Sequence, residues 1–183
     1  MRTREHKRVY SRECTISHSP GYRTQEPIFY RCSVCGTVVV RISPLDVAST
    51  DSQGGGHCCD QPMERLEICP DTSPDAAHGM RFCIFGGFAN NTIRIEVDGG
   101  NHPMGEDHCI EWIYLRTFQG GQMKVLPKKK DSAALFAMAE EDAYAFCDRE
   151  ICRMGWETCH FQCKRGHIAY AYCNVHGLKR LEF

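Results

Sequence analysis

The stretch GGNHPMGEDHCIEWIYL, residues 99–115, places two histidines in a loop immediately before an alternating apolar strand. If the chain from His102 to His108 were extended, it would separate the two imidazoles by about 20 Å. Pro103 and Gly105 instead favour a turn, which brings both imidazoles toward one point. A metal requires such an arrangement, because ligand nitrogens lie only ~2 Å from their ion. The stretch therefore predicts part of a metal site at the start of a strand.

Further segments with the same period of two predict the rest of the fold. Several short alternating strands separated by turn signals are typical of a β-sandwich. In TIRIEV, one face is expected to carry Ile93, Ile95 and Val97. In HCIEWIYLRT, one face is expected to carry Ile110, Trp112 and Tyr114. GHIAYAYC is a third such strand, which ends at Cys173.

One segment departs from this period. DSAALFAMAEEDAYAFCDREICRMG, residues 131–155, is rich in helix formers, and Phe136, Ala139, Ala143 and Phe146 can share one helical face. Asp131 or Ser132 can cap its start, and Gly155 can end it. The pattern predicts a helix inserted between strands, over residues 131–157.

Length and charge exclude several classes of function. The chain of 183 residues suits one domain, or one domain with a small module. Its 22 basic and 23 acidic side chains give a net charge of -1, unlike the basic surface of a nucleic-acid-binding protein. No apolar run approaches the ~20 residues of a membrane span, and residues 1–26 lack the apolar segment of a signal peptide. We expect a cytoplasmic protein with a polar tail over residues 1–26 that binds neither nucleic acid nor membranes.

Thirteen cysteines indicate metal or redox chemistry in such a protein. Cys32 and Cys35 form a CxxC-Gly knuckle, and Cys58 and Cys59 can complete a set of four thiolates if the chain bends between them. The glycines at 54–56 allow that bend. The alternative is a redox-active CxxC with Cys58 and Cys59 merely buried. We predict a four-cysteine metal site, although four thiolates alone do not separate zinc from iron.

This first module resembles the desulforedoxin-type iron module. FYRCSVCG and CCDQPMERL match its two halves, including the vicinal cysteines and the Gln-Pro-Met that follows them. Two departures are visible: the spacer between the cysteine pairs is longer than in the family, and Asp60 stands where a glycine is usual. The resemblance implies a module over residues 27–70 with a mononuclear iron that carries one electron at a time.

The C-terminal segment YAYCNVHGL supplies further metal-binding side chains. Cys173 and His176 have the CxxH spacing across a tight turn, which by itself is half of a zinc knuckle. Combined with His102 and His108, they make three imidazoles and one thiolate from two loops. Imidazole suits iron, zinc, copper or nickel, and a thiolate donates electron density to the metal.

HPMGEDHCIEWIYL and YCNVHGL are similar to the two signatures of the superoxide reductase family, which includes desulfoferrodoxin and neelaredoxin. In that family, four equatorial histidines and one axial cysteine hold a ferrous iron whose sixth position is open to superoxide. The resemblance implies that His102, His108 and His176 are equatorial ligands and that Cys173 is the axial ligand. It covers roughly residues 27–127 and 161–178.

The family's fourth histidine is not found in its usual motif. Glu-Lys-His-Val-Pro normally follows the linker, where this chain has SPDAAHGMRFCIFGGF. His78 is the nearest histidine, and we predict that it fills the fourth equatorial position. We also predict that Arg81 supplies the positive charge that the family's lysine provides near the open position.

The predicted fold is all-β, with the iron module followed by an immunoglobulin-like β-sandwich over residues 71–183 that carries the helical insertion. The resemblance implies an iron enzyme that reduces superoxide to hydrogen peroxide and thereby protects against oxidative stress. Its electrons would come from a rubredoxin-like donor through the four-cysteine iron, and a homodimer is left open. The leading alternative is a non-catalytic electron carrier or redox sensor with a degenerate second site. A structural zinc protein is a third alternative, which leaves the histidines unexplained.

Overall fold

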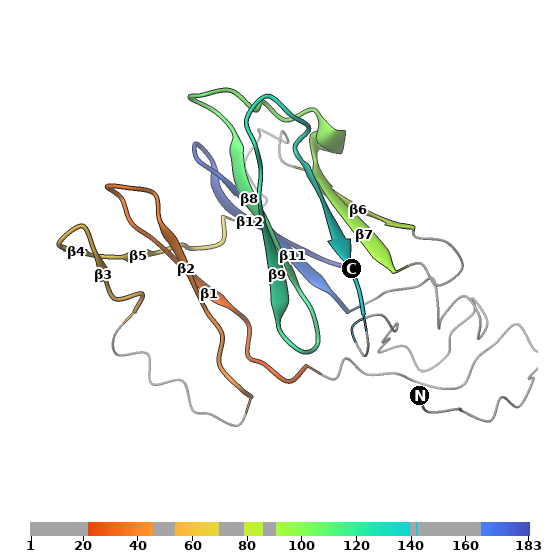
Figure 1. Ribbon diagram of the computed structural model, residues 1–183, viewed down its shortest axis with the longest axis horizontal. Helices are drawn as coiled ribbons and strands as arrows, with labels where there is room; N and C mark the ends of the chain where they lie inside the picture. Colours follow the sequence, from red (N-terminus) through yellow and green to blue (C-terminus); the bar gives the residue numbers. More distant parts are fainter. Residues whose placement is uncertain (1–21, 46–53, 70–78, 86–90, 140–141, 143–165) are drawn as a thin grey trace, which may run out of the picture.

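The computed structural model describes residues 22–45, 54–69, 79–85, 91–139, 142 and 166–183, and this part of the chain is almost entirely β-structure (Figure 1). Helical structure among these residues is limited to short 3-10 turns such as η2 (Asp98–Gly100). The all-β prediction is therefore confirmed for the described part. The strands are β1 (Ile28–Arg31), β2 (Val38–Arg41), β3 (His57–Cys58), β4 (Gln61–Pro62), β5 (Glu64–Arg65), β6 (Met80–Phe85), β7 (Thr92–Val97), β8 (Ile110–Arg116), β9 (Gly121–Val125), β10 (Ala133–Ala137), β11 (Ile168–Cys173) and β12 (Gly177–Glu182).

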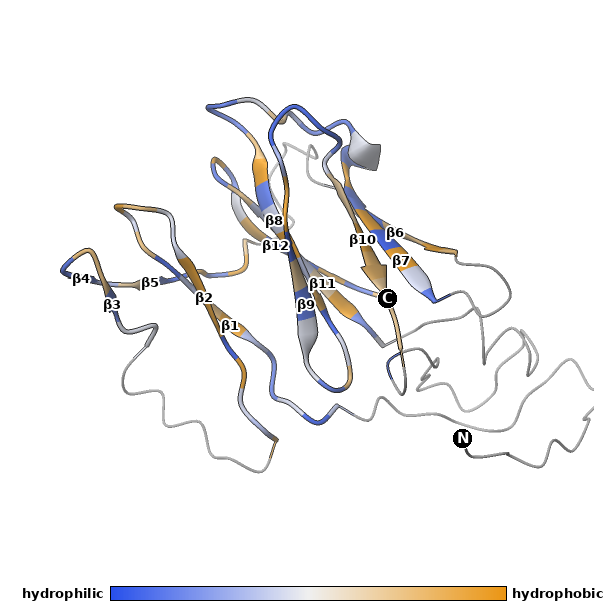
Figure 2. Ribbon diagram, in the orientation of Figure 1, coloured by the Kyte–Doolittle hydropathy of each residue, from blue (hydrophilic) through white to orange (hydrophobic). Residues whose placement is uncertain are grey.

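Two antiparallel sheets enclose the main hydrophobic core. One sheet has the order β10-β7-β6 and the other has the order β12-β11-β8-β9. Hydrophobic and hydrophilic residues alternate along β7 (Figure 2), and Ile93, Ile95 and Val97 are all buried in this core. The prediction that these three side chains share one face is confirmed. Ile113 and Leu115 of β8 meet them from the opposite sheet.

A third sheet, β2-β1-β5, covers the outer face of the four-stranded sheet. The Phe29 ring of β1 stacks on Trp112 of β8, with ring centroids 5.0 Å apart, and also contacts Tyr114 and Tyr170. Strand β11 is therefore buried on both faces, which explains its sequence IAYAYC. Its alanines face the main core, and its tyrosines face the layer that contains Phe29.

A β-bulge corrects the predicted face of Ile110. Tyr172 pairs with Trp112, but the next residue, Cys173, pairs with Ile110, so that Glu111 is an extra residue on β8. The alternation shifts by one position at the bulge. Ile110 therefore lies in the main core, while Trp112 lies in the opposite layer.

The predicted helix over residues 131–157 is wrong where the structure describes it. Residues 133–137 form β10, which pairs with β7. The remainder of the range lies outside the described residues except for 131, 132, 138, 139 and 142. Phe136 is fully buried opposite Ile93, while Leu135 is 51% exposed. Helix-forming residues adopt a strand here because pairing with β7 buries every second side chain.

Residues 22–26, at the end of the predicted polar tail, pack against the sheets. The Arg116 guanidinium lies over the Tyr22 ring, 4.0 Å from its centroid, and donates a hydrogen bond to the Thr24 carbonyl. Glu26 accepts hydrogen bonds from Tyr170 and Arg180. The immunoglobulin-like arrangement is not confirmed, and the boundary at residues 70 and 71 stays a prediction. No helix in the described ranges has the length and apolar character needed to cross a membrane.

Candidate metal centres

The structure brings together the four cysteines of the first predicted site. The sulfur atoms of Cys32, Cys35, Cys58 and Cys59 all lie within 4.8 Å of one another. The Cys35 and Cys58 sulfurs are 3.5 Å apart, and the Cys58 and Cys59 sulfurs are 3.9 Å apart. An ion held tetrahedrally at metal–sulfur distances of about 2.3 Å would set its sulfurs about 3.8 Å apart. The four-cysteine group therefore fits one metal ion.

Left-handed backbone positions create this geometry. Gly36 closes the first knuckle with φ +74°, and its amide donates to the Cys32 carbonyl. At the second pair, Cys59 and Asp60 have φ values of 51° and 60°, so the bend lies at the vicinal cysteines themselves. Aspartate tolerates this conformation better than most residues, which explains how Asp60 can stand at a position where glycine is usual.

Gly54 and Gly55 have a different role from the predicted bend, whereas Gly56, with φ +78°, has the left-handed backbone of a turn. A Cβ atom at Gly55 would lie 2.4 Å from the Cβ of Tyr30, and one at Gly54 would lie 3.0 Å from its ring. Tyr30, Cys32 and Met63 form the small core of this module. Glycine is needed here because the chain passes directly over the Tyr30 side chain.

The thiols of the four-cysteine group differ in their protonation. Hydrogen bonds from the Thr37 hydroxyl and backbone lower the pKa of Cys35 to about 6. Hydrogen bonding to Cys35 and Cys58 raises the pKa of Cys59 to about 12. One thiolate is thus stable without a cation, and a bound cation would hold the others in the thiolate form that metals require.

The second predicted group also assembles. Its four ligand atoms, one from each residue, all lie within 4.8 Å of one another, and they belong to His102, His108, Cys173 and His176. The His108 ring lies 4.6 Å from that of His102 and 4.8 Å from that of His176, measured between centroids. The Cys173 sulfur is 3.4 Å from Nδ1 of His176. We call these four residues the His/Cys group.

His102 is oriented by two neighbours. Its backbone amide donates to the hydroxyl of Ser132, which is fully buried and in turn donates to the Val97 carbonyl. Its Nδ1–H donates to the Pro103 carbonyl, 2.7 Å away, which leaves the lone pair on Nε2 for a metal. Burial lowers the pKa of His102, so the neutral form that binds metals is favoured.

Asn174 joins the two loops that carry the His/Cys group. Its side-chain amide donates to the Asp107 carbonyl, while its side-chain oxygen accepts from the Cys109 amide. The loop containing His108 is thereby fastened to the turn between Cys173 and His176. The sequence predicts a tight turn between Cys173 and His176 but no contact of Asn174 with the other loop. Its contacts across the fold, like those of Ser132, have no sequence signal.

The bulge at Glu111 and burial determine the setting of Cys173. This residue is 1% exposed at the end of β11, directly opposite Ile110. Burial raises the pKa of its thiol. A cation at the three imidazoles would reverse this effect, since it stabilises the thiolate. The donor set therefore fits a metal ion with one charged ligand.

His78 and Arg81 are the two other residues predicted for the second site. His78 lies outside the described residues. Arg81 is exposed on β6, opposite Glu96 of β7. The neighbouring Gly79 exchanges two hydrogen bonds with Asp98, whose turn leads to the His102 loop. The roles of His78 and Arg81 stay predictions.

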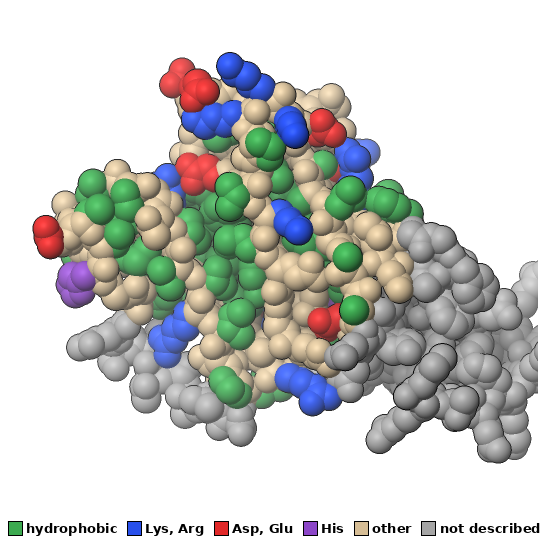
Figure 3. Space-filling model, viewed as in Figure 1, with side chains coloured by type: hydrophobic (Ala, Val, Ile, Leu, Met, Phe, Trp, Pro, Cys, Tyr) green, Lys and Arg blue, Asp and Glu red, His purple; other side chains and the backbone are tan. Residues whose placement is uncertain are grey.

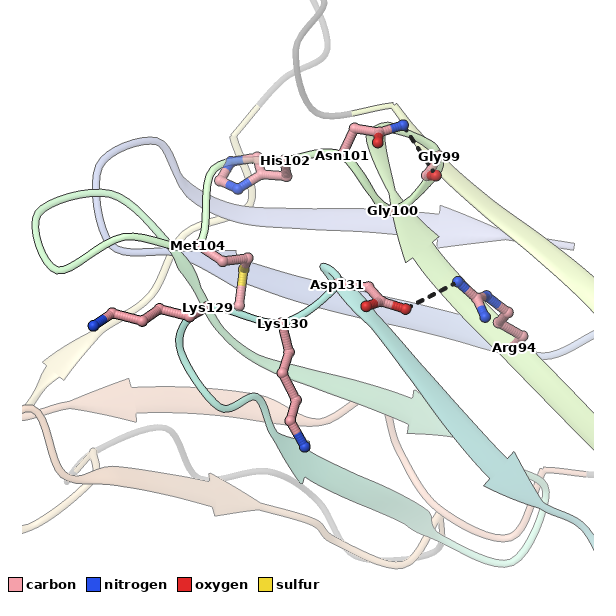
Figure 4. A pocket seen from close by; sticks show the side chains of 9 residues that line it. All are labelled: Arg94, Gly99, Gly100, Asn101, His102, Met104, Lys129, Lys130 and Asp131. Carbon is pink, nitrogen blue, oxygen red and sulfur yellow. Dashed lines mark hydrogen bonds and ion pairs between the residues drawn. The ribbon is translucent and has the colours of Figure 1, made fainter.

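A recess of about 550 Å³ lies beside His102 (Figure 4). Lys129 and Lys130 line it, but their side chains extend away from the imidazole in different directions. Arg94 is paired with Asp131 and Glu96. Lys129 and Lys130 therefore do not aim their charges at His102.

Comparison with known proteins agrees with these two groups. The desulfoferrodoxin family model matches residues 88–182, which include all four residues of the His/Cys group. A desulfoferrodoxin homolog of Methanothermobacter thermautotrophicus is 30% identical over 97 residues, or 49% of this chain and 64% of that protein, slightly less than two thirds of its length. A desulfoferrodoxin homolog of Archaeoglobus fulgidus is 27% identical over 149 residues, or 81% of this chain and 91% of that protein.

A solved structure shows the same fold. The crystal structure of the superoxide reductase from Treponema pallidum aligns with a TM-score of 0.56 at 18% sequence identity. The alignment covers 86% of this chain and 98% of that one. The two assembled groups can bind metal and are consistent with the two iron sites of desulfoferrodoxin-like proteins.

Proposed function

Because this chain belongs to the desulfoferrodoxin family, we propose that it reduces superoxide to hydrogen peroxide at the His/Cys group. The observation that carries this proposal is the convergence of three imidazoles and one buried thiol within 4.8 Å, all inside the matched region. An iron ion held there would supply the single electron of the reaction. Superoxide takes up that electron and two protons to give one molecule of hydrogen peroxide.

The protein's own residues prepare this chemistry. The Pro103 carbonyl fixes the tautomer of His102, and Asn174 holds the His108 loop against the Cys173 turn. Buried Cys173 contributes the one anionic ligand, whose electron donation favours oxidation of the metal. The three neutral imidazoles leave the loaded site with a net positive charge, which attracts the superoxide anion.

The four-cysteine group has the features of an entry point for electrons. Cys35 and Cys59 are exposed, so a metal held there would lie at the protein surface. A rubredoxin-like donor that delivers one electron at a time is part of the proposal, as are a cytoplasmic location and protection from oxidative stress. An immunoglobulin-like arrangement of residues 71–183 also belongs to it.

We propose that His78 would be a further ligand of a metal ion at the His/Cys group and that Arg81 would supply a positive charge near that ion. The support is the pair of hydrogen bonds that ties Gly79, between these residues, to the turn before His102. In the iron-loaded His78→Gln variant, the absorption spectrum of the second iron should change. An unchanged spectrum would exclude His78 as a ligand.

Stoichiometry tests the function directly. The iron-loaded, reduced protein is exposed to a measured amount of superoxide, and hydrogen peroxide and oxygen are quantified. Reduction yields one hydrogen peroxide for each superoxide without oxygen, whereas dismutation yields both products. His108→Gln should abolish the reaction, and His57→Gln, which changes an exposed histidine outside the His/Cys group, should retain it. If the iron-loaded protein leaves superoxide unconsumed, the proposal is wrong.

The absence of the Glu-Lys-His-Val-Pro motif favours one second candidate, an electron carrier or redox sensor. Such a protein would cycle its four-cysteine iron with a rubredoxin-like donor and leave superoxide unconsumed. Metal analysis separates both functions from a structural zinc protein, because zinc at both groups would exclude electron transfer at either one.

A further inference from the structure

One arginine lies between the two metal-binding groups. Arg31 is the last residue of β1 and immediately precedes the ligand Cys32. Its Nη2 and Nε atoms donate to the two carboxylate oxygens of Glu111, at 3.0 and 3.4 Å. The two side chains are 24% and 28% exposed, so this forked ion pair is partly removed from water.

The same guanidinium makes two further contacts. Its carbon atom lies 5.3 Å from the centroid of the Tyr172 ring. Its Nη2 atom lies 3.2 Å from the position that a Cβ atom would occupy on Gly36, in the knuckle of the four-cysteine group. Arg31 therefore touches the knuckle on one side and two strands of the neighbouring sheet on the other.

Both partners on the neighbouring sheet adjoin the His/Cys group. Tyr172 immediately precedes Cys173, and Glu111 is the extra residue of the bulge that places Ile110 opposite Cys173. Arg31 and Glu111 line a groove of about 650 Å³ that also contains Cys35 and Asn174. Apolar side chains gather between the module of β1–β5 and the β8–β9 hairpin in Figure 3.

We infer that Arg31 is a positioning residue that couples metal binding at the four-cysteine group to metal binding at the His/Cys group. A metal at the first group fixes Cys32 and the knuckle, and thereby fixes the guanidinium between them. The guanidinium then holds Glu111 and Tyr172 in the arrangement that presents Cys173. Such coupling is reciprocal, because each metal lowers the cost of ordering the same contacts. The inference concerns metal affinity and does not depend on superoxide reduction.

Cobalt(II) titration of the metal-free chain tests this coupling, with absorption spectra to follow each site. The affinity of the His/Cys group for Co²⁺ is measured once with the four-cysteine group filled and once in the Cys35→Ser/Cys58→Ser double variant. We expect binding to be roughly 10-fold tighter when the first group is filled, within the range typical of coupled sites. In the Arg31→Gln background, the ratio of the two affinities should fall to about 1.

Arg180→Gln is the matched control. Arg180 lies on β12, its side chain is 28% exposed, and it pairs with Glu26 and Glu182. Its replacement therefore also breaks ion pairs on the four-stranded sheet. The affinity ratio should be unchanged in this variant. Arg31→Lys keeps the charge but lacks the planar guanidinium, so this variant should lose most of the difference in Co²⁺ affinity. If Arg31→Gln does not fold, the affinity ratio of Arg31→Lys tests the inference in its place. A ratio near 1 in the parent, or a ratio unaffected by either Arg31 variant, would overturn the inference.

Discussion

At the scale of single residues, two paired tyrosines have opposite environments. Tyr114 of β8 and Tyr170 of β11 lie directly across from each other and are both buried. The Tyr170 hydroxyl donates to Glu26. The Tyr114 hydroxyl has no hydrogen-bond partner among the described residues and lies against Gly121, where a Cβ atom would be 2.0 Å away. Comparison of the two variants that lack one hydroxyl therefore isolates the value of the hydrogen bond between Tyr170 and Glu26.

We predict that Tyr114→Phe changes the free energy of unfolding by less than about 1 kcal/mol or raises it, because no buried hydrogen bond is lost. Tyr170→Phe should lower it by about 1–3 kcal/mol, since it removes a hydrogen bond to a carboxylate. Denaturant unfolding at neutral pH measures both. A larger loss in Tyr114→Phe than in Tyr170→Phe would contradict the assignment.

Alkaline pH should enlarge the advantage of Tyr114→Phe. Burial raises the pKa of Tyr114 to about 12, whereas tyrosine in the unfolded chain titrates near about 10. Between these values the unfolded chain has released a proton that the folded protein retains, so rising pH favours unfolding. The variant should therefore gain roughly 1–2 kcal/mol relative to the parent from pH 10 to about pH 12. A constant difference would mean that Tyr114 titrates normally.

At the scale of elements, the His/Cys group depends on how two loops meet. The loop before β8 carries two histidines, and the turn between β11 and β12 carries Cys173 and His176. The strands β8 and β11 pair directly and bring these loops to one end of the sheet. Asn174 makes the remaining connection through Asp107 and Cys109.

Asn174→Ala should weaken Co²⁺ binding at the His/Cys group roughly 10-fold, as expected when residues that orient ligands are lost. The matched control is Asn101→Ala, because the side-chain amide of Asn101 donates to two carbonyls of its own loop, those of Asp98 and Gly99. That variant should bind Co²⁺ as the parent does. Equal affinities in both variants would show that the clamp is unnecessary.

At the scale of the whole molecule, the sheets differ in how much hydrophobic core supports them. The two inner sheets share a large core, whereas the four-cysteine module has a core of only Tyr30, Cys32 and Met63, extended by Ile28 and Cys58. Phe29 fastens β1 to the outer face of the four-stranded sheet. Small modules of this kind depend on their metal for folding energy.

Removal of metal should therefore reduce the protection against hydrogen exchange more in the four-cysteine module than in the two inner sheets. With a chelator, hydrogen exchange should accelerate in β3 and β4, which flank Cys58 and Cys59, while β7 should remain protected by the main core. Mass spectrometry of peptides with and without chelator measures both in one sample. Equal loss of protection in β7 would show that the sheets unfold as one unit.

The sequence by itself determined which side chains come together in the two groups that can bind metal, and which strands alternate. The CxxC knuckle, the vicinal cysteines, the histidine loop and the CxxH turn are local patterns, and the structure assembles both groups from them. The alternation of TIRIEV also predicted its buried face. These inferences succeeded because ligand type, turn residues and the period of a strand are encoded within a few neighbouring residues.

Only the tertiary structure decided the features that depend on a distant partner. Residues 133–137 have the local preference of a helix, but pairing with β7 makes them a strand. The bulge at Glu111 reverses the predicted face of Ile110. The side-chain hydrogen bonds of Arg31 and Asn174 join residues that are 65 to 80 positions apart along the chain. Burial and cross-strand hydrogen bonds supply the deciding free energy in each case, and their partners lie outside any local window of sequence.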